Sequence, residues 1–191
     1  MFIIKDLIVI PIIISYIAVE YIFSFIFLII CVPLAIAAKS MAPWVPTKKK
    51  DIERFLTVLE LQKWDKFLEI WCWDARVARA VAEKFPSIDV RGIELAFPIY
   101  FLARLKNISW PKNLSILLAN AFKQDFWKYD AIYVYGMPDK MWEKIVPKFL
   151  REAKSWARLY SYVFSIPKEY DIWVISYGWE GEAKIHVLTK K

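Results

Sequence analysis

Glycine is the residue that this sequence most clearly lacks. The chain has 191 residues and only 4 glycines, whereas average usage of about 7% supplies about 13 in a chain of this length. Tryptophan, ordinarily one of the rarest residues, occurs 10 times. Any fold that needs glycine at sharp turns must therefore be reconciled with this imbalance.

Cysteine and histidine are also scarce. Cys31 and Cys72 cannot form a framework of several disulfides, and no cluster of Cys, His and carboxylate residues has the short spacings of a zinc site. His186 is the only histidine, and it lies in an alternating segment typical of a strand. These scarcities argue against metal-dependent and Ser-His-Asp hydrolases.

What the chain has in abundance is apolar residues. Its composition is 58% hydrophobic and 25% charged, which excludes a disordered or low-complexity protein. A length of 191 residues suits one domain with a short extension.

The extension is a long apolar run near the N-terminus. Residues Leu7–Ala38 carry Glu20 as their only charge. As one helix this run spans about 48 Å, more than the hydrocarbon core of about 30 Å. We expect one transmembrane helix over most of 14–38, preceded by an interfacial or tilted portion, with Pro11 and Pro33 kinking or ending helices.

Flanking charge predicts the orientation of this helix. Lys39 and the triplet Lys48–Lys50 follow the run, while only Lys5 precedes it, which places the C-terminal side in the cytoplasm. A cleavable signal peptide is the alternative, because residues 35–37 (Ala-Ile-Ala) resemble a cleavage site. The remaining residues, 39–191, have a net charge of +8, and a tether beside an anionic membrane explains this charge better than a nucleic-acid partner.

After the basic segment, helical and strand-like patterns alternate. The pattern predicts helices at 52–62, 76–85, 98–106 and 139–154, and strands at 67–71, 88–95, 114–119, 131–135, 158–165, 172–177 and 183–189. Such alternation predicts a parallel sheet with helices on both faces. The last two strands, with no helix between them, predict an antiparallel hairpin at one edge.

The first strand ends in Glu69-Ile70-Trp71-Cys72-Trp73-Asp74-Ala75. A nucleotide-binding sheet needs glycine at this bend, because the ligand approaches the backbone and the chain turns with positive φ. With glycine at 71 and 73 the segment closely resembles motif I of class I S-adenosylmethionine-dependent methyltransferases. We hypothesise that both tryptophans stand for glycine, encoded by UGA codons that the organism reads as glycine; the alternative is that they are genuine core aromatics.

The same exchange suits four other tryptophans, at Trp64, Trp110, Trp127 and Trp156, each beside a predicted turn. For Trp44, Trp142 and Trp173 we expect genuine tryptophan. A nicotinamide-dependent dehydrogenase is the rival to the methyltransferase, but its G-x-G-x-x-G pattern requires a small residue where this chain has Arg76.

Further residues fit the methyltransferase resemblance. Glu94 closes the second strand, where an acid accepts hydrogen bonds from both ribose hydroxyls. The resemblance implies that the adenine lies against Asn120 and the residues beside it, and that the methyl group lies near Tyr135-Gly136-Met137-Pro138. The cofactor-binding residues implied are Glu69, Trp71, Cys72, Trp73, Glu94, Leu95, Asn120, Ala121 and Phe122.

A narrower resemblance covers nearly the whole chain. An apolar helix, then Ala42–Thr47, then this domain, is similar to the membrane-anchored protein-lysine methyltransferases that act on the ATP synthase c-subunit and the adenine nucleotide translocase. The Val45-Pro46-Thr47 segment matches a motif that precedes the domain in that family, where the motif lies over the active site. The resemblance implies methyl transfer from S-adenosylmethionine to a protein lysine, with Tyr135, Pro138 and Thr47 as candidate catalytic residues.

The sequence thus predicts a single-pass anchor at 1–39, a basic linker at 40–51 and a Rossmann-like methyltransferase domain at 52–191 on the cytoplasmic side. We expect a membrane and a protein substrate as partners, and no metal. Two alternatives stay open: a catalytically inactive membrane-tethered binding module, if Trp71 and Trp73 are genuine, and a small-molecule or lipid methyltransferase.

Overall fold

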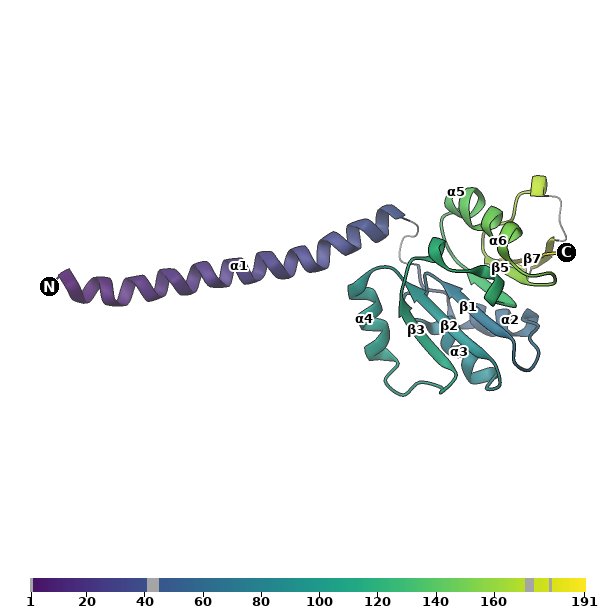
Figure 1. The fold of residues 1–191 in the computed structure, drawn as a ribbon, viewed down its shortest axis with the longest axis horizontal. Coiled ribbons are helices and arrows are strands. Elements are labelled where there is room, and N and C mark those ends of the chain that lie inside the picture. Colours follow the sequence, from purple (N-terminus) through teal and green to yellow (C-terminus); the bar gives the residue numbers. More distant parts are fainter. Residues whose placement is uncertain (1, 41–44, 171–173, 179) are drawn as a thin grey trace.

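The computed structural model describes all residues except 1, 41–44, 171–173 and 179. It consists of one long helix, α1 (Phe2–Ser40), which projects from an α/β domain (Figure 1). Trp44 and Trp173, expected to be genuine tryptophans, lie outside the described residues.

The domain is built on a seven-stranded sheet with the order β3-β2-β1-β4-β5-β7-β6. The first five strands in the chain run parallel, and β7 is antiparallel to both β5 and β6. The antiparallel pair at the edge confirms the predicted terminal hairpin. The strands are β1 (Lys66–Ile70), β2 (Asp89–Glu94), β3 (Leu114–Leu118), β4 (Ala131–Val134), β5 (Arg158–Tyr162), β6 (Val174–Tyr177) and β7 (Ile185–Thr189).

Alternating strand residues bury both faces of the sheet. Phe67 and Tyr133 belong to the core under α2 (Lys49–Val58) and α3 (Arg76–Lys84), while Leu68 and Ile132 belong to a second core on the other face. The second core is covered by α6 (Val146–Glu152) and the turns before it. A sheet covered on both faces is what the alternation of strands and helices predicted.

The remaining elements connect strands. They are α4 (Phe97–Lys106) between β2 and β3, the short 3-10 turns η1 (Ala121–Lys123) and η2 (Phe126–Lys128) before β4, α5 (Pro138–Lys140) and the π-turn η3 (Met141–Ile145) after it, and η4 (Lys168–Tyr170). The prediction of one regular helix over 139–154 was therefore wrong in detail. Pro147 has no N–H to donate to the carbonyl of Glu143, and the helix widens to a π-turn just before it.

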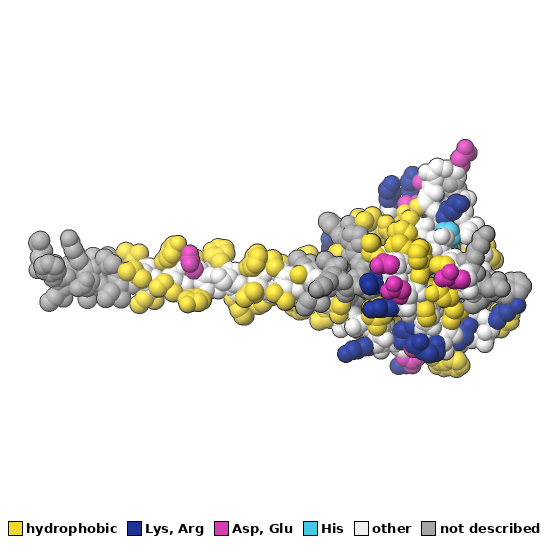
Figure 2. All heavy atoms as spheres, turned by 90° about the horizontal axis from the view of Figure 1, so that it is seen from above, with side chains coloured by type: hydrophobic (Ala, Val, Ile, Leu, Met, Phe, Trp, Pro, Cys, Tyr) yellow, Lys and Arg dark blue, Asp and Glu magenta, His cyan; other side chains and the backbone are white. Residues whose placement is uncertain are grey.

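The N-terminal helix is longer than the sequence predicts. Instead of a helix over most of 14–38 preceded by a separate portion, α1 continues as one helix from Phe2 through Pro11 and Pro33 to Ser40. Its segment Pro11–Val32 is 22 residues long, has a mean hydropathy of 2.3 and is entirely unburied. Apolar side chains cover its described surface (Figure 2). It is long and apolar enough to cross a bilayer, and a signal sequence has the same properties.

Several turns are made by residues that ordinarily avoid them. Six described residues other than glycine have a positive φ, and four of these six are tryptophans. Trp64 (φ 75°) precedes β1, and Trp156 (φ 68°) precedes β5. Their side chains are 75% and 72% exposed, so burial does not compensate for a conformation that costs an L-residue about 1–2 kcal/mol.

Replacing Trp156 by glycine tests this strain. Trp127, which is 63% exposed, lies in η2 without a positive φ and serves as the matched control. We expect Trp156→Gly to leave the protein about 1–2 kcal/mol more stable than Trp127→Gly, because only the first substitution relieves a left-handed backbone. Denaturant unfolding of the full chain in detergent measures the difference. Equal losses in the two variants contradict the prediction.

Candidate functional site

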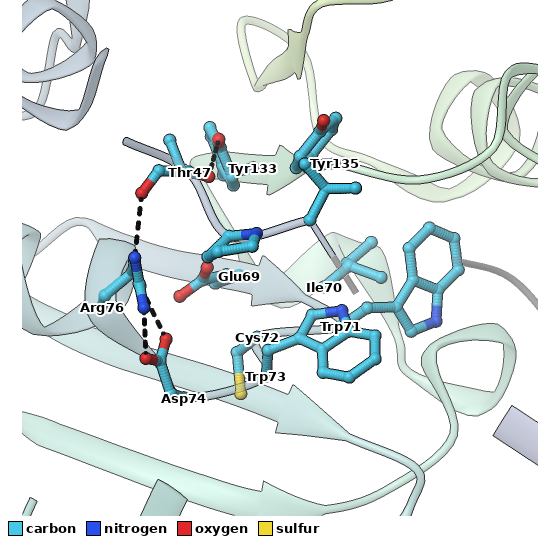
Figure 3. A pocket seen from close by; sticks show the side chains of 12 residues that line it. Thr47, Glu69, Ile70, Trp71, Cys72, Trp73, Asp74, Arg76, Tyr133 and Tyr135 are labelled. Atoms are coloured by element: carbon cyan, nitrogen blue, oxygen red, sulfur yellow. Dashed lines mark hydrogen bonds and ion pairs between the residues drawn. The ribbon is translucent and has the colours of Figure 1, made fainter. Parts of the chain in front are cut away.

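The candidate site lies at the carboxyl ends of β1 and β4. The strand order reverses between these neighbours, since the chain leaves β1 for β2 on one side and later returns to β4 on the other. Crevices at such switch points are where open parallel sheets bind ligands. Residues of the segment 45–47, of β1 and the bend after it, and of β4 surround a small cavity here (Figure 3).

The bend between β1 and α3 is left-handed three times in five residues. Trp71, Trp73 and Ala75 have φ values of 54°, 51° and 57°. The bend is held by two backbone hydrogen bonds, from Cys72 N–H to the carbonyl of Ile93 (2.9 Å) and from Ala75 N–H to the carbonyl of Cys72. A positive φ is a genuine outlier for a bulky residue and routine for glycine. The backbone therefore has the conformation that glycine adopts at both positions of the motif.

The indole of Trp71 fills the space between the ends of β1 and β4. Its side chain is 7% exposed and packs edge-on against Phe122, with ring centroids 6.3 Å apart. It also lies against the backbone of Gly136, where a Cβ would meet Cζ3 of the indole at 2.5 Å. The Trp71 indole can therefore pack this closely only because residue 136 is glycine.

The cavity that remains is too small for a cofactor. Its volume is about 20 Å³, room for about one water molecule, whereas small-molecule pockets measure about 300–1,000 Å³. Both indoles lie on one side of it, and Thr47 and Arg76 lie on the other (Figure 3). With tryptophan at 71 and 73, the cavity in this structure is too small for S-adenosylmethionine.

Glu94 ends β2 with its carboxylate turned to the backbone. One oxygen accepts hydrogen bonds from the N–H groups of Leu95 (2.8 Å) and Ala96 (2.9 Å), and the other accepts from Trp73 N–H (3.2 Å). Burial raises the pKa of Glu94, while these donors act in the opposite direction. The carboxylate is thus positioned beside the bend and ties it to β2.

Glu69 and Cys72 are buried on the α3 side of the site. Glu69 accepts a hydrogen bond from Ala78 N–H (2.7 Å) in the first turn of α3. Burial raises the pKa of Glu69 to about 8, although the Ala78 N–H acts to lower it, so this carboxyl is mostly protonated at neutral pH. Burial also raises the pKa of the Cys72 thiol, and its sulfur packs where a Cβ on Gly92 would lie.

The segment Val45-Pro46-Thr47 lies over the site and is fastened there. The Thr47 hydroxyl is 3.1 Å from the Tyr133 hydroxyl, and the Thr47 carbonyl accepts from Arg76 (3.3 Å). Arg76 is held in turn by two hydrogen bonds to the Asp74 carboxylate, of 2.9 and 2.7 Å. Burial raises the pKa of Tyr133 well above its ordinary value, so this phenol stays protonated.

The remaining predicted residues lie around this centre. Tyr135 lines the cavity, half-buried, with its ring against Tyr162 at 4.8 Å. Asn120 caps η1 by accepting from Phe122 N–H (2.9 Å), and Ala121 is buried behind it. Pro138 begins α5 and does not line the cavity. Besides the predicted Val45–Thr47 segment, four lining residues were not predicted as site residues: Ile70, Asp74, Arg76 and Tyr133. The signal for the first three was their place in or directly after the motif I segment 69–75, whereas no motif pointed to Tyr133.

Comparison with known proteins bears on the fold. No model of a protein family matches the sequence, and no curated protein matches it. Among solved structures, an RNA methyltransferase from Salinibacter ruber bound to S-adenosyl-L-homocysteine has a TM-score of 0.65 and 17% identity, covering 76% of this chain and 93% of that one.

Two further structures agree with it. A precorrin-6y C5,15-methyltransferase from Geobacter metallireducens has a TM-score of 0.60 and 16% identity over 78% of this chain and 92% of that one. A methyltransferase from Thiobacillus denitrificans, also bound to S-adenosyl-L-homocysteine, has a TM-score of 0.51 and 12% identity over 62% and 49% of the two chains. The domain has the class I S-adenosylmethionine-dependent methyltransferase fold, as the sequence predicted.

Proposed function

We propose that this protein is a membrane-anchored S-adenosylmethionine-dependent methyltransferase that carries glycine at positions 71 and 73, and that its acceptor is a protein lysine. The observation that carries the proposal is the left-handed backbone at both positions, φ 54° and 51°, at the switch point of a methyltransferase fold. The backbone has the conformation of a cofactor-binding bend, while the side chains of Trp71 and Trp73 fill the space that the cofactor would occupy.

The φ angles also sort the tryptophans. Trp64, Trp71, Trp73 and Trp156 are left-handed, and each was a candidate for glycine from its sequence position. Trp142, expected to be genuine, has helical neighbours and donates its indole N–H to the Ser165 carbonyl at 3.0 Å. At Trp110 and Trp127 the backbone requires no glycine, so among the tryptophans whose backbone the structure describes, the conformational argument supports four replacements.

The coding DNA tests this assignment directly. We expect UGA at codons 64, 71, 73 and 156, and UGG at codon 142. Mass spectrometry of the protein isolated from its own organism gives the same answer, since each tryptophan read as glycine lowers the peptide mass by the difference between the two residues. UGG at codons 71 and 73 overturns the assignment and favours the binding module.

In the glycine form, the chain supplies groups on both sides of the bend. Glu94 faces the bend from β2 and is the proposed partner of the ribose hydroxyls, and Asn120 after β3 is the proposed partner of the adenine. The cofactor supplies an electrophilic methyl group, so the protein's part is alignment and desolvation. We derive no catalytic step for the tryptophan form, because the Trp71 indole occupies the position of the cofactor.

The acceptor side is formed by Thr47, Tyr133 and Tyr135. The two phenols and the threonine hydroxyl offer hydrogen bonds to an incoming amine without a charged group among them. Burial of a lysine amine lowers its pKa and frees its lone pair, so this arrangement supports an amine acceptor. The choice of a protein lysine rests on the resemblance of an apolar helix, a Val-Pro-Thr segment and this domain in one chain.

Calorimetric titration with S-adenosylmethionine tests the site. We expect the chain as written to give no binding heat, and the double variant Trp71→Gly/Trp73→Gly to bind with a dissociation constant on the order of 1 μM. The double variant Trp127→Gly/Trp156→Gly is the control, because it removes two exposed indoles before β4 and β5, at the opposite ends of the strands from the site. Binding by the control or by the chain as written contradicts the role given to Trp71 and Trp73.

Methyl labelling identifies the acceptor class. Membranes of the source organism are incubated with the glycine form and S-adenosylmethionine carrying a labelled methyl group, and protein, lipid and RNA are then separated. We expect label in protein, on lysine side chains. Label confined to lipid or to RNA replaces the lysine proposal with that acceptor, and the Glu94→Ala form of the same variant controls for background.

A further inference from the structure

The helix α4 presents an apolar stripe to solvent. Phe97, Phe101 and Leu105 recur every four residues and therefore lie along one side of the helix. They are 49%, 51% and 47% exposed. The neighbouring Leu102 is 56% exposed, and Ile108, just beyond the helix, is 80% exposed. An amphipathic helix ordinarily turns such residues towards the core.

The stripe cannot be a displaced core face, because the helix already has one. Ala103 is the buried residue of α4, at 0% exposure, and lies on the side of the helix opposite Phe101 and Leu105. The rings of Phe97 and Phe101 stack on each other with centroids 6.3 Å apart. The apolar residues thus form a continuous outward surface, which we call the α4 stripe (Phe97, Phe101, Leu102, Leu105 and Ile108).

The chain segment that contains the α4 stripe carries only basic charges, one of which, Lys106, pairs with the Asp74 carboxylate at 3.3 Å. From Leu95 to Gln124 the chain has no acidic residue, and it carries Arg104, Lys106, Lys112 and Lys123. Arg104 lies over the ring of Trp110 at 4.8 Å, at the helix end. Aromatic and aliphatic side chains flanked by basic ones are typical of helices that lie in the interface of an anionic membrane.

The position of α4 fits such an interface. The helices α1 and α4 are in contact, and α4 lies on the side of the domain from which α1 arrives, running across the direction of α1 (Figure 1). A bilayer crossed by α1 therefore faces the α4 stripe. The part of α1 beyond Val32 is short, since eight residues of helix extend only about 12 Å, and the headgroup region takes up part of that length.

We propose that the α4 stripe docks on the lipid headgroup region of the membrane that α1 spans, so that the domain is held flat against the bilayer. This rests on the proposed membrane anchor. The two contacts fix the orientation together: α1 sets the distance of the domain from the bilayer, and α4 sets which side faces it.

The orientation has a consequence for the site. The two residues that precede α4, Leu95 and Ala96, are those whose N–H groups bind the Glu94 carboxylate. The segment Val45–Thr47, which covers the cavity, follows shortly after the end of α1. Docking of α4 therefore keeps the candidate site beside the bilayer surface, within reach of an acceptor in a membrane protein.

Lipid-borne quenchers test the docking in the full chain. A fluorescent label is placed at Phe101→Cys or Leu105→Cys in a Cys31→Ser background, and the protein is reconstituted into vesicles of phosphatidylcholine and phosphatidylglycerol. The control label is at Ile175→Cys, which is 56% exposed on β6, at the far edge of the sheet. We expect doxyl groups near the lipid headgroups to quench the two α4 labels several-fold more than the control, and aqueous iodide to do the reverse.

Other results overturn the proposal in distinguishable ways. Equal lipid quenching at α4 and at Ile175→Cys shows that α4 does not touch the bilayer, whether or not the protein transfers methyl groups. Crosslinking between Phe101→Cys residues of two chains, with no lipid quenching, identifies a second copy as the partner instead. Chains that fail to float with the vesicles overturn both the anchor and the docking, while the titration with S-adenosylmethionine remains a separate test of the site.

Discussion

The bend after β1 is the constraint on which the rest of the site depends. It turns the chain from a buried strand into α3 within five residues, and it does so with three left-handed residues, Trp71, Trp73 and Ala75. The bend is tied to the second strand by Cys72 N–H and by the Glu94 carboxylate. A tight bend of this kind exposes bare backbone to a ligand, and that is its use in a nucleotide-binding sheet.

The side chains of Trp71 and Trp73 do not suit the conformation of this bend or its use as a binding site. Two indoles occupy the edge where a cofactor approaches, and the cavity shrinks to about 20 Å³. Proteins do store strain at functional sites, but Trp64 and Trp156 repeat the same conformation before β1 and β5, at the opposite ends of the strands from this bend. The proposed reading of UGA as glycine acts on codons rather than on one site, and it would account for both places.

The segment that joins α1 to the domain is bound at the candidate site. The segment after α1 crosses the site and is bound there through Thr47 to Tyr133 and Arg76. In the proposed docking, the basic and apolar surface of α4 lies against the bilayer that α1 spans. A methyltransferase domain held in this way would be limited to acceptors near the bilayer, so that selection of a substrate would begin with location before any contact in the site.

Much of the fold could be predicted from the sequence because strand and helix patterns are local. The strand β4 is apolar throughout, α3 has clear helical spacing, and the hairpin followed from two strands without a helix between them. The π-turn before Pro147 and the continuation of α1 through both Pro11 and Pro33 as one helix could not be predicted, since the effect of a proline depends on what the surrounding helix can absorb.

Some features of the site could likewise be predicted from the sequence, and others could not. The sequence alone determined where motif I lies and that Glu94 ends the second strand, and it predicted glycine at 71 and 73, because these follow from spacing along one chain. Only the tertiary structure decided that Tyr133, Asp74 and Arg76 line the cavity, that Trp71 packs on Gly136, and that the stripe on α4 faces outward. Those relations join residues far apart in sequence, and their distances are set by sheet order and packing, which no local pattern contains.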